Sequence, residues 1–403
     1  MADKLPSGLP RLAPLPYHDA VVAYLRSEEP ELWQWAGSAQ AREEHADEVR
    51  SELLKNTYRL DAQAHPDLHA CCAAAAARLG LQAPVTLYQA GDGAMNASLY
   101  HLPGEAHIVF TGPLLERLKG AELEAVLGHE LAHHVLWELA CGAYHAADRL
   151  LGAALNDPRA SASQVQTARL FQLYTEAFAD RGGAVACAAL APAVTALVKT
   201  QTGLADVSAT SYLQQADEIC AGANAMSDAR SHPEVFVRAR ALRLWCEAAP
   251  EADDWLAATL EGPLALDSLD LLGQQRLTAL TRRVLAQFLQ LRCLRSDGLL
   301  AHARRYFPDL RPDDNVDAGL ASEVTAAIGT HDYLAAVLTD FAVADRELDD
   351  VPLAAALELA QRLGLDERFE RFVQKELRLP KRQFQRLRQD AASLLERARQ
   401  QHG

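Results

Sequence analysis

The segment His129-Glu130-Leu131-Ala132-His133 carries two histidines four residues apart, with a glutamate between them. On a helix this spacing places both imidazoles on one face, one turn apart, as a shared metal ion requires. Zinc in catalytic sites takes three protein ligands and keeps a fourth position for water, so a third ligand must come from elsewhere in the chain. The segment therefore predicts half of a zinc hydrolase site, although an amphipathic helix with two surface histidines can carry the same pattern.

Two carboxylates further along the chain could complete such a site. Glu176 and Asp180 lie four residues apart in a stretch that is also expected to be helical, so both project from one face. Glu176 is the candidate third ligand, and Asp180 is the candidate acceptor for the free N–H of a ligand histidine, whose tautomer it would fix. Acidic pairs at this spacing are also common on solvated helix faces. The prediction therefore depends on the two motifs together.

Two helices must position these groups. Apolar residues at helical spacing predict one helix over 121–147 and a second over 163–190. The apolar stretch 182–198 contains glycine and proline and is too short to span a membrane, so we expect a buried helix and turn behind the site. His134 and His145 lie off the face of the two ligand histidines, and surface or packed positions are expected for them.

The motifs resemble, in their order, the HtpX and CAAX-prenyl-protease type of gluzincin, which is family 48 of the zinc metallopeptidases. The resemblance extends to further segments: an opening strand at 84–88, an Asn-Ala substrate-edge segment at 95–98, a strand followed by a helix at 107–115, and a closing His-Pro and arginine segment at 231–240. It implies a mainly α (α+β) fold, with a gluzincin-type helical core and a small β-sheet.

The resemblance also implies roles for individual residues. It implies one zinc ion per chain with three protein ligands: His129, His133 and Glu176. Glu130 would act as general base and then general acid in peptide hydrolysis. Asn96 would hold the substrate backbone or the developing oxyanion, and His232 would donate to the same charge. The alternatives are a turn residue at Asn96 and a residue ahead of a helix-starting proline at His232.

Composition narrows the class of peptidase. The chain has 403 residues, of which 49% are hydrophobic and 23% charged, as in ordinary globular proteins. The net charge of −15 argues against nucleic acid as a partner. A basic stretch at 378–388 is expected to be a solvated helix face. The seven cysteines form no CxxC pair and are expected to be reduced core residues.

The start of the chain has no apolar core or cleavage pattern, so we expect no secretory signal and a cytoplasmic location. The better-known members of the resembled family carry membrane helices around the catalytic core. We expect no transmembrane segment here, so soluble protein or peptide substrates are favoured over prenylated or membrane-embedded ones.

Changes in pattern predict three regions. These are an N-terminal helical region over 1–59, a zinc metallopeptidase domain over 60–249 and an all-helical module over 264–403. Helices are expected at 18–26, 41–58 and 67–79, with Trp33 and Trp35 in the first connection, and they would either brace the core or shield its cleft. Further helices are expected at 277–294, 321–328, 333–344, 352–363, 367–377 and from 381.

Part of the C-terminal module, 333–365, resembles the TerB-like helical modules of stress proteins. That resemblance nominates Asp345, Glu347 and Asp349 as a cation or partner site, but a turn capped by Asp349 or Asp350 is the preferred interpretation. The leading hypothesis is a soluble zinc-dependent endopeptidase whose C-terminal module recruits substrates or protein partners. The rivals are a stress-associated interaction protein with a structural zinc site, and a latent peptidase whose site is shielded.

Overall fold

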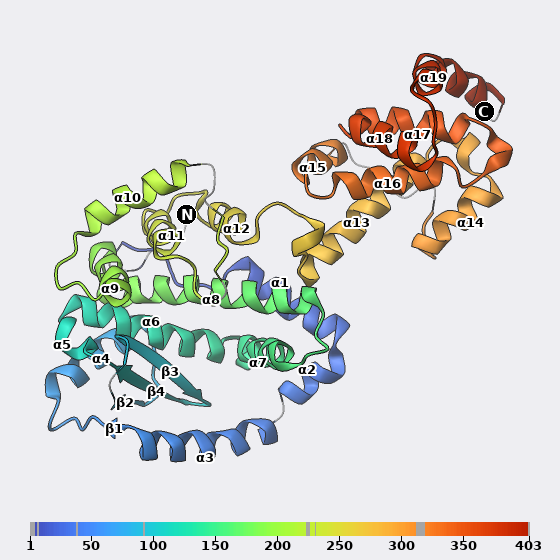
Figure 1. Ribbon diagram of the computed structural model, residues 1–403. Coiled ribbons are helices and arrows are strands. Elements are labelled where there is room, and N and C mark those ends of the chain that lie inside the picture. Colours follow the sequence, from blue (N-terminus) through green and yellow to red (C-terminus); the bar gives the residue numbers. More distant parts are fainter. Residues whose placement is uncertain are drawn as a thin grey trace. The chain divides into compact units, whose positions relative to one another are not determined.

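The computed structural model describes residues 5, 8–37, 39–91, 93–222, 226–229, 231–311 and 319–401. The chain forms two compact units, Met1–Gly262 and Pro263–Gly403. The first unit contains the four-stranded sheet and the candidate site, and the second contains helices (Figure 1).

The sheet has the order β1-β2-β4-β3. Its strands are β1 (Tyr58–Arg59), β2 (Val85–Gln89), β3 (Asn96–Leu102) and β4 (Glu105–Thr111). β2 and β4 are parallel, whereas β3 runs antiparallel to β4, from Asn96 opposite Thr111 to Leu102 opposite Glu105. A tight turn joins β3 to β4, and Gly104 adopts the positive φ of 77° that favours glycine there. Because β3 ends the strand order, its outer edge is not paired within this sheet.

The central strand β4 is buried on both faces. Along β4, Ala106, Ile108 and Phe110 are fully buried in a core shared with α4 (Pro66–Leu79) and α6 (Ala121–Glu138). Val109 points to the other face and packs with apolar side chains of α3 (Ala39–Asn56). Figure 1 shows the resulting order of layers, with α3 beneath the sheet, then α6, then α8 (Ala162–Cys187).

The helix expected over 121–147 is interrupted. α6 ends at Glu138, a 3-10 segment covers Leu139–Gly142, and α7 (Ala143–Asn156) follows. Leu139 is extended, and Ala140, Cys141 and Gly142 all have positive φ, so the backbone turns before α7 begins. The unbroken apolar pattern concealed this turn. The helix expected over 163–190 is confirmed as α8; it starts at a capping box formed by Ser161 and Gln164 and ends three residues early.

α6 and α8 cross at very short range, because glycines occupy the contact. A Cβ atom placed on Gly128 would lie 2.1 Å from the Cβ of Ala186, and one on Gly182 would lie 2.2 Å from the Cβ of Ala132. Any larger residue at either position would push the two helices apart. This close approach brings the histidine motif of α6 within reach of the carboxylates of α8.

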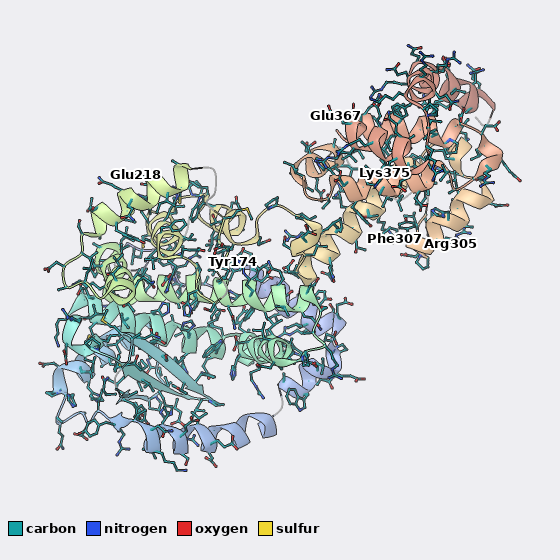
Figure 2. The ribbon with its side chains drawn as sticks, in the orientation of Figure 1. Tyr174, Glu218, Arg305, Phe307, Glu367 and Lys375 are labelled. Atoms are coloured by element: carbon teal, nitrogen blue, oxygen red, sulfur yellow. The ribbon has the colours of Figure 1, made fainter. Side chains whose placement is uncertain are left out.

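The N-terminal helices α1 (Pro16–Glu28) and α2 (Pro30–Ala36) pack beside α7 and α8. Tyr17 stacks on Tyr174 of α8, labelled in Figure 2, with ring centroids 4.6 Å apart, and buried His18 contacts Thr175 through Nε2 at 3.3 Å. Tyr174 also donates to Glu261. Trp33 and Trp35 lie in α2 rather than in a connection, since Pro30 starts a short helix there.

The first unit is completed by α5 (Leu114–Arg117), α9 (Leu190–Thr202), α10 (Ala209–Ala221), α11 (Val235–Cys246) and α12 (Ala252–Glu261). The stretch 182–198, expected to form a buried helix and turn, comprises the end of α8, a turn at 188–189 and the first part of α9. None of the helices that the structure describes combines the length and the apolar character needed to cross a membrane.

The second unit contains seven α-helices in its described part: α13 (Leu271–Phe288), α14 (Asp297–Tyr306), α15 (Leu320–Ala326), α16 (His331–Ala342), α17 (Val351–Arg362), α18 (Asp366–Glu376) and α19 (Lys381–Gln401). The sequence-based expectations omitted α14. The acidic turn between α16 and α17 contains a 3-10 segment, Arg346–Leu348, which Asp345 caps by accepting from the Glu347 N–H. Asp345 also accepts from the Ser296 hydroxyl, whereas the side chain of Asp350 makes no capping hydrogen bond to α17.

Candidate metal centre

Two imidazoles and one carboxylate converge where α6 faces α8. The Nε2 atoms of His129 and His133 lie 3.3 Å apart. Glu176 places one oxygen 3.5 Å from His129 Nε2 and the other 3.6 Å from His133 Nε2. One ligand atom from each residue therefore lies within 4.8 Å of the other two. Two imidazole nitrogens and a carboxylate oxygen are a donor set that suits zinc.

Asp180, one turn after Glu176, orients the site. Its Oδ1 lies 3.1 Å from Nδ1 of His129, so this carboxylate accepts from the Nδ1–H and leaves the other ring nitrogen, Nε2, facing Glu176 and His133. Arg238 from α11 donates to both oxygens of Asp180, at 2.8 and 2.6 Å. The same guanidinium lies 3.4 Å from Glu176. Arg238 lies in the closing segment at 231–240, and the sequence alone indicated no separate role for it.

The charges in this cluster are strongly coupled. Burial alone would lower the pKa of His129, but hydrogen bonds to Asp180 and Glu176 raise that pKa to about 10. Burial alone would likewise raise the pKa of Glu176, but His129 and Arg238 hold it well below its usual range. A carboxylate kept ionised beside histidines is suited to binding a divalent cation. The cation would take the place of the proton that lies between His129 and Glu176. Burial lowers the pKa of His133 to about 4, so this imidazole is neutral, as a ligand must be.

Glu130 projects from α6 beside the cluster and is buried. Burial is the main cause that raises its pKa to about 7, while nearby His129 and a backbone hydrogen bond from Leu99 of β3 oppose the rise. A carboxyl group that titrates near neutrality can accept and return a proton at physiological pH. The contact with Leu99 also shows that Glu130 faces the edge strand.

The remaining candidates lie along the same cleft. It has a volume of about 1090 Å³, and its walls include all seven residues singled out from the sequence: Asn96, His129, Glu130, His133, Glu176, Asp180 and His232. Asn96 is exposed at the first position of β3. His232 is 59% exposed, with Nε2 3.4 Å from Glu176. The structure thus brings all seven together, with Asn96 on the strand edge. None of the described residues before Ala94 lines this cleft.

The close approach of α6 and α8, which brings the two motifs together, was not predicted from the sequence. Gly128 directly precedes the first histidine, and Gly182 follows Asp180 by two residues, so paired small residues beside both motifs were the available signal.

Comparison with known proteins gives one match. Residues 62–246 match the model of Peptidase family M48, and this segment contains all seven residues of the cleft named above. The match covers slightly less than half of the chain. No curated protein and no solved structure matches the chain.

Proposed function

Since residues 62–246 match a metallopeptidase family, we propose that the chain is a zinc-dependent endopeptidase of the HtpX type that acts on soluble proteins or peptides. The observation that carries the proposal is the position of Glu130. Its carboxyl lies in one cleft with the His129, His133 and Glu176 cluster and contacts the edge strand where a peptide could bind.

In this proposal His129, His133 and Glu176 hold one zinc ion. Zinc in such a site lowers the pKa of a water ligand and polarises a carbonyl group. Asp180 keeps the His129 ring in the required tautomer, and Arg238 fixes Asp180 in turn.

Glu130 performs the proton transfers. It takes a proton from the water that attacks the scissile carbonyl carbon, and it passes this proton to the nitrogen of the leaving amine as the C–N bond breaks. Its raised pKa suits both transfers, because a base that titrates near neutrality also becomes an adequate acid once protonated.

His232 and Asn96 contact the substrate. The exposed ring of His232 lies beside Glu176, where an N–H can donate to the negative charge that develops on the carbonyl oxygen. The unpaired edge of β3 borders the same cleft, so an extended peptide could add to the sheet there, with Asn96 holding its backbone.

The proposal extends to the surroundings of the enzyme. All seven cysteines are unpaired, which suits a reducing compartment such as the cytoplasm. We also propose that the helical second unit, TerB-like in part, binds substrates or protein partners.

A survey of new protein N-termini tests the activity. Lysate incubated with zinc-loaded wild type should gain new N-termini that are missing with Glu130→Gln, because the amide cannot accept the proton. Equal zinc contents in the two proteins would show that the substitution spares the metal site. Identical N-termini with both proteins would contradict the peptidase proposal and favour a structural zinc site or a latent enzyme.

A further inference from the structure

A second group of histidines lies beside the cleft but shares no side chain with the cluster above. It comprises His101 near the end of β3 and His134 and Glu138 on α6. The Nδ1 atoms of His101 and His134 are 2.8 Å apart, and Nε2 of His101 lies 3.5 Å from Glu138. One ligand atom from each residue lies within 4.8 Å of the others, as in the first cluster.

From this geometry we propose that His101, His134 and Glu138 form a second site for a divalent transition metal of the zinc class. Two imidazole nitrogens and a carboxylate oxygen are ligands that such ions prefer. Ligand atoms around tetrahedral zinc are separated by about 3.4 Å, so small side-chain rotations bring these three groups onto one ion.

Two further observations support a site here. His134 is fully buried and the side chain of His101 is 4% exposed, so the two facing rings lie inside the protein. Two ring nitrogens that face each other can share one proton, or both can bind one cation. A separate cavity of about 420 Å³ is lined by His101 and Glu138, and also by His145 and Cys141, so an ion and its water ligands have room to enter.

The site would join two elements that matter to the cleft. His101 belongs to the edge strand β3 and the other two ligands belong to α6, so a bound ion would fix the strand on the helix. Trp137 lies between the two clusters, with ring centroids 5.7 Å from His133 and 5.3 Å from His101. The second ion would therefore stabilise the strand without contacting the reacting groups.

The same contacts could instead be a hydrogen-bonded chain from Glu138 through His101 to His134. In that case no ion binds, and the zinc content of the protein separates the two possibilities.

The test is a zinc titration of the full chain, stripped with a chelator and then measured by elemental analysis after dialysis. Wild type should bind two ions per chain, and Glu176→Ala should keep the second one. His101→Asn should bind one, and His101→Asn combined with Glu176→Ala should bind none. His107→Asn is the matched control, because His107 is also a buried strand histidine beside a glutamate but belongs to neither metal-capable group.

Glu138→Gln tests the same site should His101→Asn fail to fold. The Glu138 side chain is 45% exposed, so it can be replaced without disturbing the core. This variant should also reduce the number of bound zinc ions from two to one per chain, while its far-ultraviolet circular dichroism spectrum stays unchanged. An equal zinc count in wild type, His101→Asn and Glu138→Gln would overturn the proposal, as would complete loss of zinc in Glu176→Ala.

Discussion

The two histidine clusters share the helix α6, yet their surroundings differ. The cluster of His129, His133 and Glu176, called the α8 cluster below, lies where α6 faces α8 and opens into a cleft beside Glu130. Helix α8 supplies Glu176 as well as Asp180, which orients His129. The cluster of His101, His134 and Glu138, called the β3 cluster below, includes one residue of β3 and has one half-exposed carboxylate, Glu138.

This difference separates metal binding from catalysis. Both clusters bring together ligand types that suit zinc, but the α8 cluster alone is accompanied by a buried carboxyl with a pKa near 7. Of the two clusters, it is also the one whose histidine is oriented by an ionised carboxylate, Asp180, which Arg238 holds in place. We therefore propose that the α8 cluster serves catalysis and that the β3 cluster has a structural role.

The largest expected effect comes from removing the ligand that α8 supplies. Glu176→Ala should weaken zinc binding at the α8 cluster by more than about 100-fold. Loss of a residue that merely hydrogen-bonds a metal ligand costs about 10–100-fold in affinity, and loss of a direct ligand costs more. Peptidase activity should disappear with the metal. Competition with a zinc chelator measures the affinity, and unchanged affinity at this cluster would remove Glu176 from the ligand set.

A smaller effect is expected from separating the two helices without touching a ligand. Gly182→Ala places a methyl group 2.2 Å from the Cβ of Ala132, so α8 must move away from α6. We expect a loss of about 1–3 kcal/mol in the free energy of unfolding and weaker zinc binding at the α8 cluster. The β3 cluster contains no residue of α8 and should be unaffected.

Gly152→Ala is the matched control for this prediction, because a Cβ atom on that helical glycine of α7 meets nothing within 4 Å. It should be neutral or slightly stabilising. Thermal melting and zinc titration of the two variants measure the difference. Equal behaviour of both alanine variants would show that the close helix crossing does not position the site.

The smallest effect concerns a cleft carboxylate outside both clusters. Burial raises the pKa of Asp148 to about 6, whereas cations lower that of Glu176. The folded chain therefore keeps a proton on Asp148 between about pH 4 and 6 that the unfolded chain has released, and stability falls as the pH rises through this window. Asp148→Asn should raise the melting temperature at pH 8 by about 2 °C, with the gain disappearing near pH 4. A gain that persists at pH 4 would assign the effect to packing.

The sequence allowed good prediction of features that are encoded locally. The HExxH segment, the Glu176 and Asp180 pair and most helix positions follow from spacing along one element. α6 begins at the expected residue, and α8 lies close to its expected range. The break at Leu139–Gly142 was missed, because the apolar pattern continues through it while the backbone does not.

Features that arise from contacts between distant segments were harder to predict. His101 and His134 meet because β3 lies against α6, and no spacing in the chain records that contact. Similarly, Arg238 reaches Asp180 from a helix 58 positions away. Three-dimensional packing was therefore needed to recognise the second cluster and the arginine that supports the first.

We propose that the α8 cluster binds the zinc ion of a peptidase. Anomalous diffraction at the zinc absorption edge, from crystals of the zinc-loaded full chain, tests this most directly. We expect a strong peak within about 2.0–2.2 Å of His129 Nε2, His133 Nε2 and a Glu176 oxygen. Zinc bound elsewhere, with no peak between these three residues, would contradict it.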